Sequence, residues 1–137
     1  MCYYLYGSLH GDVSGQDYKI IQSRYGCRIP LGTKHDVKLV VKAAAVCVQE
    51  DFRITDWVCD CDSPVGKHDP DDPTIMELSR LITELSQLPG AEQINICKTW
   101  TGKQNKKEIP VKLKDAELPA LLADMQENCL YCLDLSS

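Results

Sequence analysis

The clearest helix signal in the chain lies in residues 72–90, which read DPTIMELSRLITELSQLPG. Asp72 is a typical N-cap residue, and Pro73 suits the first helical position because the N–H that proline lacks would have no partner there. Apolar residues then recur at helical spacing and form one stripe: Leu78, Leu81, Ile82, Leu85 and Leu88. The pair Pro89-Gly90 ends the element. The predicted helix therefore covers Asp72 to Leu88.

Six segments are predicted to be strands because they are rich in β-branched or aromatic residues or alternate between apolar and polar positions. They cover residues 3–9, 37–48, 52–61, 94–100, 109–113 and 129–135. The second also contains Ala43-Ala44-Ala45, which fits a helix equally well. The turn-like residues 102–107 predict a hairpin between the fourth and fifth strands. Pro110 lies in that hairpin, and inside a sheet proline removes a ladder hydrogen bond.

Two further helices are expected, one from a cap at Ser14 to a stop at Gly26 and one from Asp115 or Glu117 to Glu127. The chain order is then strand, helix, strand, strand, helix, strand, strand, helix, strand. Two overlapping parts of the chain, 1–101 and 52–135, each have the βαββαβ order of a ferredoxin-like sandwich.

The predicted fold class is therefore α+β, with a mixed, largely antiparallel sheet and helices on one face. In this prediction a ferredoxin-like βαββαβ core is extended by a further β-α-β.

Composition indicates an ordinary globular protein, and residues 1–137 are expected to form a single domain. Hydrophobic residues make up 44% and charged residues 26%, and the net charge of −5 argues against general nucleic-acid binding. No signal peptide or membrane-spanning segment is evident, which predicts a cytoplasmic location. The eight cysteines are then expected to be reduced thiols rather than a disulfide framework.

The most unusual composition occurs in residues 57–69, WVCDCDSPVGKHD, which hold two thiols, three carboxylates and an imidazole. Aspartate is among the residues that strands use least, so strand propensity does not explain this segment. Alternation along a strand would place Cys59 and Cys61 on one face and Asp60 and Asp62 on the other. One face then offers soft metal ligands and the other offers hard ones.

A zinc site is one interpretation of these residues. Cys129 and Cys132 have the short spacing of zinc knuckles, and with Cys59, Cys61 and His68 they supply enough thiolate and imidazole ligands. However, a C-x-C pair is tighter than the usual knuckle. In a straight strand, moreover, residues 129 and 132 point to opposite faces. The alternative is that these cysteines are small buried hydrophobic residues.

A divalent cation bound through oxygen is a second interpretation. Enough oxygen and nitrogen donors for magnesium, manganese or zinc are present in Asp60, Asp62, Asp69, Asp71 and Asp72 with His68. A metal-activated water would permit hydrolysis. Turn and capping chemistry in a solvated acidic loop explains the same residues without a metal. Whether the protein is an enzyme is left open by the sequence.

Two other groups of residues have simple explanations. His10 and His35 lie beside turn residues and are interpreted as polar surface residues. Five lysines surround the predicted hairpin near Trp100: Lys103, Lys106, Lys107, Lys112 and Lys114. They fit an acidic partner or nucleic acid, but they are also typical of an edge strand protected against pairing with other chains.

Two functions remain as hypotheses. In the first, the protein is a small cytoplasmic domain that binds zinc or another divalent cation. In the second, it is a non-catalytic ligand-binding or interaction module that self-associates, for example as a homodimer, through an exposed sheet face or edge.

Overall fold

The computed structural model describes residues 3–25, 31–32, 54, 59–100 and 107–136, and it has an α+β fold. The elements are β1 (Tyr3–Gly11), α1 (Gly15–Tyr25), β2 (Leu31–Gly32), α3 (Pro73–Ser86), β3 (Ala91–Trp100), β4 (Lys107–Lys112), the 3-10 helix η3 (Leu113–Asp115), α4 (Leu118–Ala123) and β5 (Cys129–Asp134). No helix in these described ranges has the length and apolar character needed to cross a bilayer.

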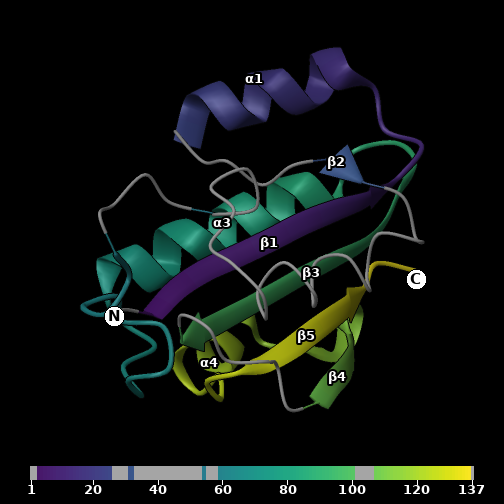
Figure 1. The fold of residues 1–137 in the computed structure, drawn as a ribbon. Coiled ribbons are helices and arrows are strands. Elements are labelled where there is room, and N and C mark those ends of the chain that lie inside the picture. The colour runs from purple at the N-terminus through teal and green to yellow at the C-terminus, as the bar shows by residue number, and fades with distance from the viewer. Residues whose placement is uncertain (1–2, 26–30, 33–53, 55–58, 101–106, 137) are drawn as a thin grey trace.

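The strands form one mixed sheet in the order β2-β1-β3-β5-β4. The central pairs β1–β3 and β3–β5 are antiparallel, whereas the outer pairs β1–β2 and β4–β5 are parallel. Figure 1 shows α3 and α4 behind this sheet, with α1 beside α3. The prediction of an α+β fold with a mixed sheet is therefore confirmed.

The predicted hairpin between β3 and β4 is wrong. β4 follows β3 in the sequence, but it lies at the far edge of the sheet and pairs in parallel with β5. The segment β4–η3–α4–β5 is a β-α-β unit instead. Pro110 explains why an edge suits β4, because an edge strand needs hydrogen bonds on one side only.

The hydrophobic core lies between the sheet and its helices. Alternate residues of the central strands, including Leu9, Ile94 and Leu133, pack there against α3 residues such as Ile75 and Leu85, and all five are fully buried. The predicted cap of α3 is confirmed, since the Asp72 carboxylate accepts a hydrogen bond from the backbone N–H of Thr74 at 2.8 Å. The apolar stripe predicted from the sequence therefore places α3 on the sheet.

The last helix is shorter than predicted. α4 has 6 residues, whereas α3 has 14. α4 ends at Ala123, where Asp124 is its C-cap, so the predicted helical residues up to Glu127 lie in an irregular segment. At a rise of about 1.5 Å per residue, α4 spans only about 9 Å beside about 21 Å of α3. The two helices therefore cover the sheet unequally.

Several separate segments meet the outer edge of β1. β2 pairs beside Leu9 and His10, the Ile54 N–H donates to the Leu5 carbonyl at 3.0 Å, and the Asp60 N–H donates to the Tyr3 carbonyl at 2.9 Å. The predicted strand at 37–48 lies outside the described residues, as does most of the strand predicted at 52–61. Its described residues, 54 and 59–61, are not in strand conformation, so that part of the prediction is wrong.

Candidate functional site

The first part of the cysteine- and acid-rich segment is bound to β1. Asp60 is fully buried, and its Oδ2 accepts a hydrogen bond from the Leu5 N–H at 2.8 Å. The neighbouring Cys61 Sγ accepts one from the Tyr3 N–H at 3.3 Å. These side chains supply acceptors that an adjacent strand would otherwise provide. Asp60 and Cys61 therefore have a structural role, since they satisfy backbone N–H groups of β1.

The rest of this segment follows a turn at the protein surface. Asp62 is exposed, unlike Asp60, so the two carboxylates do not share a face as a strand would have placed them. His68 is exposed too, with a positive φ of 64°, and its Nδ1 lies 2.9 Å from Asp124 Oδ1. The Asp69 carboxylate accepts from the Asp71 N–H at 3.2 Å, which is ordinary turn chemistry.

The second cysteine pair straddles the sheet. Cys129 belongs to the core on the helix side, whereas Cys132 pairs with Asn95 and Pro110 on the opposite face. Burial, with smaller contributions from Glu108 and Cys97, raises the pKa of Cys132 to about 11. A thiol with such a pKa is a poor nucleophile and a reluctant metal ligand at neutral pH.

The eight predicted ligands all lie in the described part of the chain: Cys59, Asp60, Cys61, Asp62, His68, Asp69, Cys129 and Cys132. No group of three or more His, Cys, Asp or Glu side chains there is arranged to hold a metal ion. Zinc and other divalent cations stay predictions, to which this arrangement adds no support.

A buried lysine anchors the same loop from the other side. Lys98 on β3 is 2% exposed, and its Nζ donates to the carbonyls of Val65 at 3.0 Å and Ser63 at 3.5 Å. Burial lowers the pKa of Lys98, and the nearby charge of Lys67 lowers it further. The amine is enclosed by the loop whose carbonyls it binds, so it is not available to a site at the protein surface.

A buried polar network occupies the other face of the sheet. His10 Nε2 lies 2.6 Å from Ser8 Oγ and 2.8 Å from Asn95 Nδ2, and Gln93 Nε2 donates to Asn95 Oδ1 at 2.7 Å. His10 is fully buried, so its interpretation as a surface residue is wrong. The i, i+2 spacing of Ser8 and His10 in a strand was the available signal. Because these groups are enclosed, the network is a structural element of the sheet.

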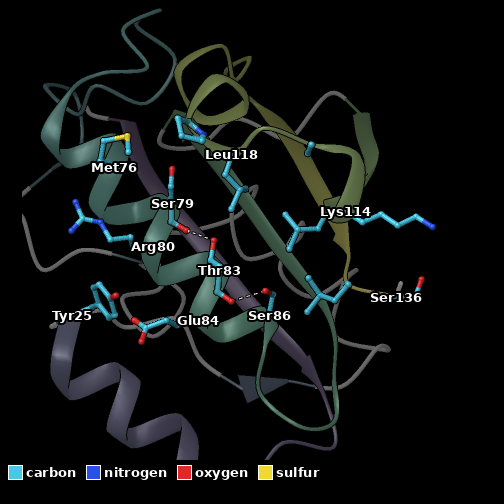
Figure 2. Close-up of a pocket in the computed structure, with 14 residues that line it drawn as sticks. Tyr25, Met76, Ser79, Arg80, Thr83, Glu84, Ser86, Lys114, Leu118 and Ser136 are labelled. Atoms are coloured by element: carbon cyan, nitrogen blue, oxygen red, sulfur yellow. Dashed lines mark hydrogen bonds between the residues drawn. The ribbon is translucent and has the colours of Figure 1, made fainter.

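A large hollow lies instead in the helix layer, between α3 and the segment formed by η3 and α4. Its volume is about 770 Å³, and Leu135 and Ser136 border it at the end of β5. In Figure 2, Ser79, Thr83 and Ser86 of α3 lie on the side of the helix that faces Leu118, whereas Arg80 and Glu84 lie on its other side, near Tyr25. We call it the helix groove.

One wall of the helix groove is a row of small hydroxyl residues on α3. The Ser79 hydroxyl donates to the Ile75 carbonyl at 2.8 Å, Thr83 donates to Ser79 at 2.8 Å, and Ser86 donates to Thr83 at 2.6 Å (Figure 2). Each hydroxyl hydrogen is therefore used within the helix. What the wall presents to the groove is short side chains and oxygen lone pairs.

The opposite wall is apolar except for Lys114 and Ser136. Leu113 of η3, Leu118 and Pro119 of α4, and Leu135 after β5 line it, and Met76 closes one end from α3. Leu118 is 8% exposed and Met76 is 38% exposed, so the groove runs from the core to the surface. Such a mixture of apolar walls and a few polar groups is typical of binding sites of this volume.

Cations flank the helix groove. Arg80 on α3 and Lys114 on η3 are both exposed and border it from opposite sides. Glu84, the acidic residue of the lining, lies in an ion pair with Arg24, and its hydrogen bond with Tyr25 raises the pKa of that tyrosine. The two cations therefore outnumber the single carboxylate in the described lining of the groove.

Sequence reasoning did not find this groove. Ser79, Thr83 and Ser86 recur at helical spacing beside the apolar stripe of α3, which is a weak signal on its own. Comparison with protein-family models, with curated proteins and with solved structures finds no match to this chain.

Proposed function

We propose that this protein is a non-catalytic binding module whose ligand site is the helix groove. The observation that carries the proposal is a groove of about 770 Å³ with apolar and hydroxyl walls. This volume falls in the usual range for sites that hold small molecules or peptide side chains. The reactive groups described elsewhere, including Asp60, Lys98 and Cys132, are engaged in internal contacts or have a pKa unsuited to catalysis at neutral pH.

Self-association through a sheet edge is a less supported form of the same proposal. β4 is an edge strand, but it carries Lys107, Pro110 and Lys112, features that protect an edge from further pairing. This form of the proposal assumes the ferredoxin-like core, whose exposed sheet face or edge would form the contact between copies. The antiparallel pairing of β1 with β3 agrees with such a core over residues 1–101. The strands predicted at 37–48 and over most of 52–61, which would complete that core, lie outside the described residues.

The groove is tested by titrating the protein with anilinonaphthalene sulfonate, an anionic apolar dye that fluoresces when it leaves water. We expect saturable binding to the wild-type protein. Thr83→Trp places a large ring in the groove from an exposed helical position and should weaken dye binding by on the order of tenfold. Glu77→Trp, also exposed on α3 but outside the groove, is the matched control and should bind as the wild type does.

Circular dichroism and the urea midpoint of each variant establish that the fold is retained, since partly unfolded proteins also bind this dye. Equal affinities for all three folded proteins, or no saturable binding by the wild type, would contradict the proposed site.

A further inference from the structure

We infer that the occupant of the helix groove is an amphipathic α-helix of a partner protein, with acidic residues on both sides of its apolar stripe. The inference rests on the proposed function and names the partner class for that site. It follows from the length of the groove, from the side chains of its walls and from its charge.

The length of the groove fits a short helix. Its α3 wall extends from Met76 to Ser86, which is about 15 Å at 1.5 Å per residue, or nearly three turns. α4 stops far short of the length of α3, so η3 and Leu135 border part of the space in the helix layer. A helix lying along α3 would extend that layer.

The two walls suit the two sides of such a helix. The short side chains of Ser79, Thr83 and Ser86 allow another backbone to approach α3 closely, and helices pack at about 8–10 Å between axes. Leu113 and Leu118 on the facing wall offer contacts for leucine-type side chains. Helix-in-groove complexes use residues at i, i+3, i+4 and i+7 in this way.

Charge selects an acidic partner. Arg80 and Lys114 stand on opposite sides of the groove, and Glu84 is paired with Arg24. The whole chain carries a net charge of −5, so this local positive charge differs in sign from that of the protein. Carboxylates on both flanks of an incoming apolar stripe would face these two cations, and basic flanks would be repelled.

The test uses two synthetic helical peptides of about 15 residues, a length at which isolated helices are marginally stable. Both carry leucines at i, i+3, i+4 and i+7; one has glutamates beside the stripe and its twin has lysines. We expect the acidic peptide to bind the full chain with a Kd on the order of 10 µM, and its twin at least about tenfold more weakly. Raised salt should narrow this difference.

Charge reversal supplies the decisive variant. Arg80→Glu with Lys114→Glu changes two exposed residues, so the fold should be retained, and it should reverse the preference of the protein from the acidic to the basic peptide. Thr83→Trp should weaken the binding of both peptides, and Glu77→Trp should weaken the binding of neither. Equal binding of the two peptides to wild type, or an unchanged preference in the reversed variant, overturns the inference.

Dodecanoate is titrated as a competing type of occupant. Binding of the dye and of dodecanoate that is blocked by Thr83→Trp, without binding of the acidic peptide, would leave the groove as a ligand site and refute the helical partner. If the wild-type protein binds neither the dye, nor dodecanoate, nor either peptide, the groove itself is refuted as a binding site.

Discussion

The segment from Cys59 to Asp69 and the helix groove use their side chains in opposite ways. The first has the most conspicuous residues of the sequence, yet Asp60 and Cys61 accept hydrogen bonds from the backbone of β1. The second is built of ordinary serine, threonine and leucine residues, yet it leaves a hollow of about 770 Å³. Unusual composition can therefore reflect the internal hydrogen bonding of a fold, whereas a hollow can arise where common residues do not fill the space between helices.

The largest expected effect concerns the reactivity of Cys132, another conspicuous residue. Its pKa of about 11 lies well above the usual 9.0, so at pH 8 it should react with iodoacetamide about a hundredfold more slowly than an unstructured peptide thiol. Mass spectrometry of the labelled protein over a pH series measures the rate. Labelling of Cys132 at the peptide rate at pH 8 would show that this thiol is available for chemistry.

Asp60→Ala should lower the free energy of unfolding by about 2–3 kcal/mol, because it leaves the buried N–H of Leu5 without this acceptor. Asp62→Ala, which removes an exposed carboxylate two residues away, should change it by less than about 0.5 kcal/mol. Urea unfolding of both variants tests the contrast. Similar losses of unfolding free energy in the two variants would contradict the distinct role of Asp60 in binding β1.

Cys59→Ser with Cys61→Ser should change the unfolding free energy by less than about 1 kcal/mol, because a serine hydroxyl still accepts from the Tyr3 N–H. Metal content, measured by elemental analysis after purification without chelator, should be the same in variant and wild type. Loss of one equivalent of zinc, with a melting temperature lower by several degrees, would instead support the metal-binding hypothesis for this segment.

The smallest expected effect is a pH slope due to Lys98. Its pKa is lowered in the folded state, so between that value and the usual 10.5 the unfolded state binds more protons. Stability relative to Lys98→Met should therefore rise with pH up to about 10.5. Urea unfolding of wild type and variant at several alkaline pH values measures the difference, in which the contribution of Cys132 cancels. A difference that falls as pH rises would contradict the burial of this amine.

Local chemistry made much of the fold predictable. Asp72, Pro73 and the leucine stripe placed α3, and segments rich in apolar and aromatic residues placed β1, β3 and β5 within a few residues of their bounds. The partner of β4 was not predictable in this way. A turn-like sequence suggests a hairpin between β3 and β4. In the structure β5 pairs with β3, so β4 lies at the edge beyond β5, and this strand order is not encoded in the turn.

The candidate site was less predictable than the fold. Residue types drew attention to Asp60 and Cys61, but their hydrogen bonds to β1 depend on residues more than fifty positions apart in the chain. The helix groove depends on α4 ending at Ala123 and on η3 and Leu135 lying opposite α3. None of these features is visible in a local pattern.

Local sequence is sufficient to predict which segments become the main helices and strands, because caps, turns and apolar periodicity act within a few residues. The tertiary structure alone decided which polar groups are enclosed, as with His10 and Asp60, and where the helix layer leaves space. Those outcomes depend on which distant segments come to lie side by side, and packing against the sheet sets that arrangement.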